Sequence, residues 1–349
     1  MNLLIVIPYT GYYSDFSRHL NNYLDGIKDA RKITVTTVTP PFYSYYVKKI
    51  KWVGKKKSAI YLIFNFFFFL FRFVITKGQR YDTVILASHV VAIPFLFAIR
   101  VLPFMRPRKN IIVTSFFLHD MGKKKIIQKI LRFLFANKRL LLLAQSTYEV
   151  EYYSQLTDKA KVIHFPFCQH EVSSSEKCGQ GEEYIFSGGY TNRDYDCLLK
   201  AVQKVDHDFL IICSRLNQMD QANQKSSNVR ILSDTTHKDF HGYLKNSKIV
   251  IIALKEETGS AGQMVALAAM SFKKPIIYTN IDSVSQYFEE GVSGIPYEKN
   301  NAEDLIEKIL YLLSDVHLRE ELGTNACMRY HERYHISKYC EFLANLILR

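Results

Sequence analysis

Short apolar runs recur through the first half of the chain at the spacing of buried strands. They are rich in β-branched and aliphatic residues and lie at 3–8, 33–39, 83–87, 111–116, 140–144 and 161–165. Runs of this kind suit strands that are covered on both faces. Stretches with helical periodicity lie between them, at 14–30, 59–76, 90–102 and 123–137. Strands that alternate with crossover helices predict a parallel sheet with helices on both sides.

A polar, Ser- and Gly-rich stretch at 168–182 interrupts this pattern, and we interpret it as a linker. A second alternation follows, with strands expected at 183–187, 208–213, 229–232, 248–254 and 275–278. Helices are expected at 193–205, 237–246, 260–272 and 301–314, before a helical tail at 317–349. A chain of 349 residues is long enough for two domains. We therefore predict an α/β protein with Rossmann-like domains at 1–167 and 183–330 and a terminal helix at 331–349.

Charge is distributed unevenly between the two predicted domains. Residues 1–165 contain 26 Lys and Arg against 8 Asp and Glu, whereas the remainder contains 20 against 25. A basic half is expected to face an anionic partner, either nucleic acid or an anionic lipid surface. The basic runs are interleaved with Phe and Leu on predicted helices and do not form a recognition motif. We therefore favour a lipid surface and expect no nucleic acid partner.

One apolar segment of the basic half is a candidate for a membrane-spanning helix. Residues 59–75 are almost continuously apolar, but they number only 17 and are interrupted by Asn65 and Arg72. A spanning helix needs about 20 apolar residues. The segment therefore favours a buried or interfacial helix, with a transmembrane helix as the alternative.

Three basic segments favour a surface that docks on anionic lipid. Residues 47–57 hold six lysines and Trp52, the only tryptophan, directly before the apolar segment. Basic and aromatic side chains in this arrangement suit the headgroup region of an anionic bilayer, and a solvated loop is the alternative. Segments 106–109 and 122–139 combine basic and apolar residues in the same way.

The cysteines and the N-terminus both favour the cytosol. The six cysteines form no CxxC pair and no disulfide framework, as expected of reduced thiols. The first residues, MNLLIVIPYTG, are apolar but lack a basic region and a cleavage site, so we interpret them as a strand and expect no export.

The most informative stretch lies at 248–297. A strand is expected to end near Leu254, and Gly259–Gly262 then open a helix. Small residues at this position let a ligand approach the backbone, and the free N–H groups and the helix dipole favour a phosphate. Ser260 could cap the helix or donate a hydrogen bond to that phosphate. The core stripe of the helix is expected to consist of Met264, Leu267 and Met270.

The same stretch resembles the donor-site region of glycosyltransferase family four, whose members are retaining enzymes of the GT-B fold. The order and spacing of four motifs carry the resemblance: Ser260-Ala261-Gly262-Gln263, Leu267–Ser271, Lys274–Ile277 and Glu290–Ile295. A second block, YIFSGGYTNRDYDCLL from residue 184, resembles the family pattern G-G-R-S-x-R-D-Y-x-x-L-L-x-A.

The resemblance implies two Rossmann-like domains that face a central cleft, with a nucleotide-diphosphate sugar on the C-terminal domain and the acceptor on the N-terminal one. The terminal helix would cross back to the first domain. Arg193 would act in catalysis as a cation on the donor diphosphate, and neither a metal nor a cofactor is expected. The other residues that it implies for donor binding are Gly188, Gly189, Tyr190, Ser260, Ala261, Gly262 and Gln263.

Two residues of the first domain also match family features. His119, at the end of the predicted strand 111–118, stands where the family carries a histidine that faces the donor sugar, which makes it a second catalytic candidate. Gly11 lies in a loop that resembles the glycine-containing loop near the donor phosphate and the acceptor.

Three positions depart from the family pattern or imitate another motif. The second glutamate of the donor motif, which holds the nucleotide ribose, falls on Ala268, which we expect to face a solvated donor cleft. Tyr190 replaces an arginine. Asp194-Tyr195-Asp196 spells a DxD sequence, which we interpret as a helix start and not as a metal site.

We therefore predict a retaining, hexosyltransferase-type enzyme of cell-surface polysaccharide synthesis. It would move a sugar from a nucleotide-diphosphate sugar to a lipid-linked saccharide acceptor, as a peripheral protein on the inner face of the plasma membrane. The alternative is a catalytically impaired GT-B subunit that acts as a membrane-associated scaffold, suggested by Ala268 and Tyr190.

Overall fold

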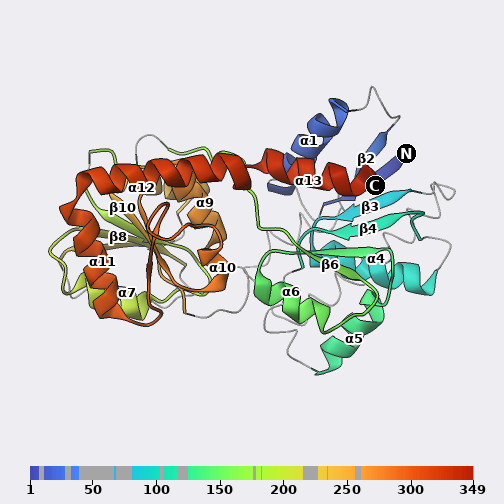
Figure 1. The fold of residues 1–349 in the computed structure, drawn as a ribbon, viewed down its shortest axis with the longest axis horizontal. Helices are drawn as coiled ribbons and strands as arrows, with labels where there is room; N and C mark the ends of the chain where they lie inside the picture. Colours follow the sequence, from blue (N-terminus) through green and yellow to red (C-terminus); the bar gives the residue numbers. More distant parts are fainter. Residues whose placement is uncertain are drawn as a thin grey trace. The chain divides into compact units, whose positions relative to one another are not determined.

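The computed structural model divides the chain into two compact units (Figure 1). The first unit contains Met1–Pro166 and Tyr339–Arg349, and the second contains Phe167–Lys338. The residues that the structure describes are 1–7, 12–27, 33–38, 67, 81–102, 106–116, 125–175, 178–181, 183–214, 227–233, 235–255 and 261–348. The predicted basic segment 47–57 and, apart from residue 67, the apolar segment 59–75 lie outside the described residues.

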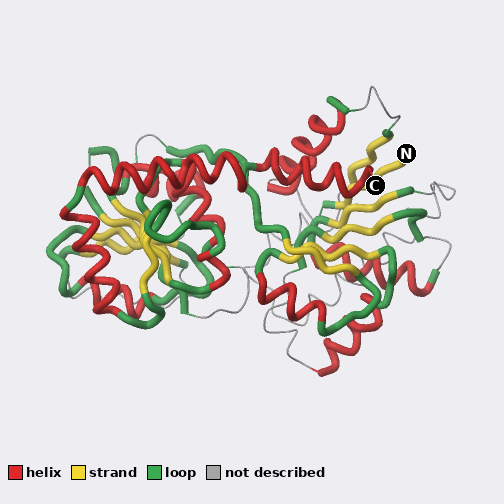
Figure 2. The backbone as a smooth tube through the Cα atoms, in the orientation of Figure 1, coloured by secondary structure: helices red, strands yellow, loops and turns green. Residues whose placement is uncertain are grey.

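The first unit contains a sheet, whose strands are drawn in yellow in Figure 2. The strands are parallel and have the order β2-β1-β3-β4-β5-β6. Its strands are β1 (Asn2–Val6), β2 (Thr34–Val38), β3 (Thr83–Leu86), β4 (Asn110–Val113), β5 (Leu140–Ala144) and β6 (Lys161–His164). Each overlaps an apolar run that predicted it, and β1 and β4 begin one residue earlier than expected. In the central strand β3 all four side chains are buried, because helices cover both faces of the sheet.

The helices of the first unit form two layers. The elements α4 (His89–Val101), α5 (Lys125–Phe135) and α6 (Thr147–Ser154) contribute to a core with the sheet, whereas α1 (Tyr12–Asp25) lies on the other side (Figure 1). Beside α1 lies the C-terminal part of α13 (Ile336–Leu348). Two aromatic side chains of α13 pack against rings elsewhere in the first unit. The ring centroids of Tyr339 and Phe16 lie 5.5 Å apart, and those of Phe342 and Phe165 lie 4.0 Å apart.

The second unit contains another parallel sheet, ordered β12-β11-β10-β7-β8-β9. Its strands are β7 (Ile185–Gly188), β8 (Phe209–Cys213), β9 (Val229–Ser233), β10 (Ile249–Ile252), β11 (Ile276–Thr279) and β12 (Ile295–Tyr297). Five of these strands were predicted. The three-residue β12 was not, because it directly follows a glycine turn and is too short to show a period.

Helices cover both faces of this second sheet. The elements α8 (His237–Asn246) and α9 (Gln263–Ser271) pack into one core, and α7 (Tyr195–Val202) and α11 (Ala302–Ser314) pack into the other. A short α10 (Asp282–Ser285) follows β11. The predicted helical tail consists of α12 (Val316–Arg329), a π-helical turn η8 (Tyr330–Tyr334) and α13. His335, with extended backbone at ψ 145°, separates η8 from α13.

The segment predicted as a linker differs from expectation at its beginning. Cys168 and Gln169 are buried within the second unit. The backbone N–H of Gln169 donates to Tyr334 O at 3.0 Å, and the Gln169 carbonyl accepts from Ile336 N at 3.1 Å. These hydrogen bonds attach the start of the polar stretch to the C-terminal helices of the second unit. The second unit therefore begins directly after Pro166, and the chain returns to the first unit at Tyr339, some way into the predicted terminal helix.

None of the helices within the described ranges is both long and apolar enough to cross a bilayer.

Candidate functional site

The strand order of the second sheet places two predicted donor segments together, at the carboxyl ends of neighbouring strands. The chain runs outward from β7 through β8 to β9 and then returns to the other side of β7 as β10. Ligands of open α/β sheets bind beyond the carboxyl ends of the strands at such a switch point. Gly188–Arg193 span the end of β7 and the turn after it, and Ala261–Gln263 comprise the two residues directly before α9 and its first residue. Because β7 and β10 are paired and parallel, both segments belong to the same edge.

Two glycines shape the turn after β7. A Cβ on Gly188 would lie 2.7 Å from a ring carbon of Phe240, so any other residue would clash with the core. Gly189 has a φ of 136°, which disfavours other residues, and a Cβ there would overlap the guanidinium of Arg193. The glycines are thus needed for close packing beneath the turn as well as for its conformation.

Arg193 is buried below this turn, with 7% of its surface exposed. Its Nε donates to the Gly188 carbonyl at 3.0 Å and its Nη1 to the Thr191 carbonyl at 2.7 Å. Burial lowers the pKa of the guanidinium, but an arginine retains its charge in proteins. The side chain therefore holds a positive charge under the turn and ties the two ends of the turn together.

Tyr195 is a second anchor, and the sequence analysis did not assign it a role. Its hydroxyl donates to the Gly189 carbonyl at 2.6 Å, and its side chain is buried. Burial raises the pKa of Tyr195, so the hydroxyl keeps its proton and remains a donor. The R-D-Y part of the family pattern was the available signal for this residue.

The loop that carries Arg193 is also attached to the end of β10. The backbone N–H of Asp194 donates to Ala253 O at 3.1 Å, and that of Lys255 donates to Asn192 O at 3.3 Å. Asn192 has a left-handed φ of 54°, a conformation that asparagine tolerates better than most residues. These bonds fix the turn after β7 against the strand that leads to α9.

The DxD sequence opens a helix, as predicted. Asp194 is the N-cap of α7, and its carboxylate accepts a hydrogen bond from Cys197 N at 3.1 Å. Asp196 lies in the first turn and pairs with Lys255 at 2.9 Å. The two carboxylates thus have separate partners.

The start of α9 differs from the sequence prediction in one respect. The helix was expected to open at Gly259–Gly262, but it begins at Gln263, and its N-cap is Gly262 with a left-handed φ of 81°. A Cβ on Gly262 would lie 3.1 Å from side-chain carbons of Ile252 and Leu254, which explains the need for glycine. Among the described residues, no side chain caps the first turn, and the turn contains no acidic residue. Its free N–H groups and the positive end of the helix dipole can therefore receive an anion.

Gln263 adds a second donor at this position. Its side chain is 5% exposed, and its Nε2 has no hydrogen-bond partner among the described residues. A buried amide donor without a partner is unfavourable by about 1–3 kcal/mol, so such groups call for an explanation, and a bound ligand is one. The uncapped backbone and this amide together make the start of α9 an anion-binding candidate.

Two side-chain positions on α9 were predicted wrongly. Ala268 is fully buried in the core of the second unit and does not face a solvated cleft. Met264, expected in the core stripe, is 49% exposed, whereas Leu267 and Met270 are buried as predicted. The prediction assumed a helix with one buried and one exposed face. The helix starts later than expected and is buried on most of its surface, so its apolar residues do not mark a single buried face.

The remaining predicted residues divide into two groups. Tyr190 is described and lies within the turn after β7, where it is 43% exposed. Ala261 is buried directly before α9. His119, Gly11 and Ser260 lie outside the described residues. The binding and catalytic roles assigned to all of these residues remain predictions.

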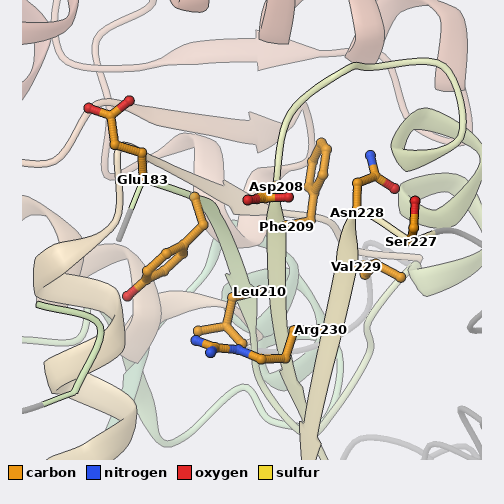
Figure 3. A pocket seen from close by; sticks show the side chains of 9 residues that line it. Glu183, Asp208, Phe209, Leu210, Ser227, Asn228, Val229 and Arg230 are labelled. Carbon is orange, nitrogen blue, oxygen red and sulfur yellow. The ribbon is translucent and has the colours of Figure 1, made fainter. Parts of the chain in front are cut away.

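A measurable pocket of the second unit lies at the opposite edge of the sheet (Figure 3). Its volume is about 370 Å³, and its walls come from the amino ends of β7, β8 and β9. It is lined by Glu183, Tyr184, Asp208, Phe209, Leu210, Ser227, Asn228, Val229 and Arg230. Several of these polar groups are already paired: Glu183 with Lys248 at 2.5 Å, and the Asn228 amide with three backbone carbonyls. This pocket is therefore distinct from the predicted donor residues.

The described residues of the candidate site lie within a segment that matches a known protein family. Residues 182–315 match the family model described as glycosyl transferases group 1. An uncharacterised glycosyltransferase of Methanocaldococcus jannaschii is 26% identical over 147 residues, which cover 40% of this chain and 41% of that protein. The match thus spans less than half the length of this curated relative.

Solved structures resemble the whole chain at low sequence identity. Sucrose-phosphate synthase of Thermosynechococcus elongatus has a TM-score of 0.74 at 12% identity and covers 100% of this chain and 99% of its own. HepE of Anabaena, solved in complex with UDP-glucose, has a TM-score of 0.64 at 14% identity and covers 99% of both chains. These likenesses show the GT-B type of α/β fold, with two parallel six-stranded sheets, and confirm the predicted fold class.

Proposed function

We propose that this protein is a glycosyltransferase that uses a nucleoside diphosphate sugar as its donor. The observation that carries the proposal lies at the switch point between β7 and β10. There, among the described residues, the start of α9 has no side-chain cap and the adjacent Gln263 amide has no hydrogen-bond partner. Both features lie within the segment that matches the glycosyl transferases group 1 model. A diphosphate placed there would receive hydrogen bonds from backbone N–H groups and from the Gln263 side chain.

The same groups could assist the chemical step. When the sugar leaves its donor, negative charge grows on the departing diphosphate, and preorganised donors aimed at that charge lower the barrier. The helix start supplies such donors, and the buried guanidinium of Arg193 adds a positive charge below the adjacent turn. Arg193 would therefore act on the diphosphate partly through the turn that it holds in place.

Further details of the reaction follow from the family resemblance. We propose transfer of a hexose with retention of the anomeric configuration and without a metal, the leaving phosphate helping to deprotonate the acceptor. His119 would contact the donor sugar, and Gly11 would approach the donor phosphate and the acceptor. The basic composition of residues 1–165 supports a lipid-linked saccharide of cell-surface polysaccharide synthesis as the acceptor, reached at the inner face of the plasma membrane.

Calorimetry followed by a turnover assay tests this proposal. UDP and UDP-glucose are the first probes, because HepE was solved with these ligands, and GDP and GDP-mannose follow. We expect one nucleoside diphosphate to bind and its sugar to be consumed, with release of the diphosphate and an unchanged anomeric configuration in the product. Absence of binding by every nucleotide would contradict the proposed donor site.

A catalytically impaired scaffold is the second candidate function. Ala268 stands where the family has a ribose-binding glutamate, and its complete burial leaves no room for a larger polar group at that position. A scaffold of this kind would bind nucleotide weakly or not at all and would show no turnover with any donor. A measurable turnover number with one donor and acceptor excludes it.

A further inference from the structure

Helix α5 exposes an apolar stripe on its surface. Ile126, Ile130 and Phe133 are 69%, 49% and 51% exposed. Their spacing of four and then three residues places them on one face of the helix. The helix buries a different set, Leu131, Leu134 and Phe135, in the core of the first unit. The exposed stripe is therefore additional to the face that the fold requires.

A basic stripe runs beside the apolar one. Lys125, Lys129 and Arg132 follow the same spacing, each one position before a residue of the apolar stripe, and all three are exposed. At 3.6 residues per turn, this offset of one residue places the basic stripe about a quarter of a turn around the helix axis from the apolar stripe. Between Asp120 and Glu149 the sequence contains seven Lys and Arg and no acidic residue. The two stripes together, Lys125, Ile126, Lys129, Ile130, Arg132 and Phe133, are called the α5 surface below.

The α5 surface is held in a defined position by its neighbours. The guanidinium of Arg100, on α4, donates from Nε and Nη2 to Phe133 O at 3.1 and 2.7 Å, and from Nη2 to Ala136 O at 2.5 Å. It also lies 5.1 Å from the centre of the Phe133 ring. These bonds satisfy carbonyls at the C-terminal end of α5 and add another positive charge beside the stripe. The helix is thus anchored to the unit by its buried face and by α4.

We propose that the α5 surface docks on an anionic phospholipid bilayer, with Ile126, Ile130 and Phe133 inserted among the lipids and the basic stripe at the level of the headgroups. Apolar side chains flanked by Lys and Arg are the pattern of helices that lie in the membrane interface. The long stems of lysine and arginine let their charges reach the headgroups while the helix lies against the lipid. A partner that offers negative charge above an apolar layer complements both stripes. This inference deepens the proposed function, because it names the surface that would bring the enzyme to a lipid-linked acceptor.

Two triple variants separate the apolar and basic contributions. One carries Ile126→Ser, Ile130→Ser and Phe133→Ser, and the other carries Lys125→Ser, Lys129→Ser and Arg132→Ser. Binding is measured by co-sedimentation with vesicles of mixed phosphatidylglycerol and phosphatidylcholine, and with vesicles of phosphatidylcholine alone. We expect the wild type to prefer the anionic vesicles. The basic variant should bind them about 100-fold more weakly, equivalent to about 3 kcal/mol for three basic residues. The apolar variant should lose at least tenfold and bind weakly to both types of vesicle.

Matched controls come from the second unit. Leu310 and Tyr311 on α11 are 50% and 54% exposed, and Leu310→Ser with Tyr311→Ser should leave vesicle binding unchanged. Lys200, Lys238 and Lys245 are exposed, and replacing all three by Ser removes the same charge away from α5. Thermal unfolding of each variant shows whether it is folded. Because every replaced side chain is exposed, we expect melting temperatures close to that of the wild type.

Several results would overturn the inference. Equal binding of the wild type to both kinds of vesicle, or equal losses in the α5 and control variants, would contradict docking through this surface. Binding to DNA without binding to vesicles would assign the charge to nucleic acid. Loss of a wild-type dimer in the apolar variant, without any vesicle binding, would assign the stripe to a second copy. The assay needs neither donor nor turnover, so its failure is distinguishable from failure of the proposed glycosyl transfer.

Discussion

Gln263 combines burial with an amide donor that has no partner among the described residues, and this gives its replacement two opposite effects. In Gln263→Leu the unpartnered Nε2 disappears, so the free energy of unfolding should increase by about 1 kcal/mol or more. The hydrogen bond to the donor phosphate is lost as well, which should weaken nucleoside diphosphate binding about 10- to 100-fold. Chemical unfolding and calorimetry measure the two effects. Gln203→Leu, at an exposed position on the same unit, is the control. A variant that is stabilised and binds nucleotide as the wild type does would remove Gln263 from the site.

Arg193 requires a comparison of two substitutions, because its guanidinium both carries charge and anchors the turn. Arg193→Met removes the charge and leaves the Gly188 and Thr191 carbonyls without their donor, so we expect lower stability and at least a tenfold loss of kcat/KM. Arg193→Lys keeps the charge but cannot reproduce the two forked hydrogen bonds. It should be destabilised in a similar way and yet recover part of the nucleotide affinity.

The measurements for both Arg193 variants are thermal unfolding, calorimetry and steady-state kinetics. If the folded Lys and Met variants bind nucleotide equally weakly, the charge has no role and Arg193 is a positioning residue only. Both variants are also expected to lose stability, because the Arg193 side chain is buried.

At the scale of elements, neighbouring positions on α9 are expected to differ strongly in how well they tolerate substitution by a charged residue. Ala268 is fully buried, and a carboxylate placed there would lose its hydration without gaining a partner, at a cost of several kcal/mol. We expect Ala268→Glu to unfold the second unit or to lower its melting temperature sharply. Met264→Glu, four residues earlier on the same helix and 49% exposed, should change stability by about 0.5 kcal/mol or less.

Thermal unfolding of these two α9 variants tests the burial pattern directly. A stable Ala268→Glu protein with tighter nucleotide binding would instead support a cleft at position 268, as in the family pattern. The physical reason for expecting the opposite is that Ala268 packs in the core formed by α8, α9 and one face of the sheet.

At the scale of the molecule, the second unit contains both of its own cores and all the described donor-site residues. A fragment of residues 167–338 should therefore unfold cooperatively and bind nucleotide as the full chain does. A fragment of residues 1–166 should be less stable, because it lacks Leu343 and Ile347, which are fully buried in the intact chain. Joining residues 339–349 to the first fragment through a flexible linker should restore its stability. Circular dichroism during heating compares the three, and a disordered 167–338 fragment would contradict the division into units.

Several parts of the fold could be predicted from the chain because they depend on local pattern. Eleven of the twelve described strands overlap apolar runs. In central strands such as β3 and β10 every side chain is buried, because a strand covered on both faces needs apolar side chains at successive positions. Short elements were missed: α6 begins at a Ser146 cap without an apolar period, and α10 and β12 are shorter than one recognisable repeat. The break at His335 was missed because α12, η8 and α13 show similar helical periodicity on both sides of it.

The sequence by itself determined the class of the protein. The alternation of strands and helices specifies two parallel sheets, which the structure confirms. The phosphate-binding site predicted from the glycine and arginine motifs and the anionic partner predicted from the charge difference stay predictions. Only the tertiary structure decided how individual side chains are used. It buried Arg193 beneath Gly189, enclosed Ala268, exposed Met264 and left the Gln263 amide without a partner among the described residues. Periodicity assigns residues to faces of an element, but burial depends on which neighbours pack against each face, and those neighbours come from distant parts of the chain.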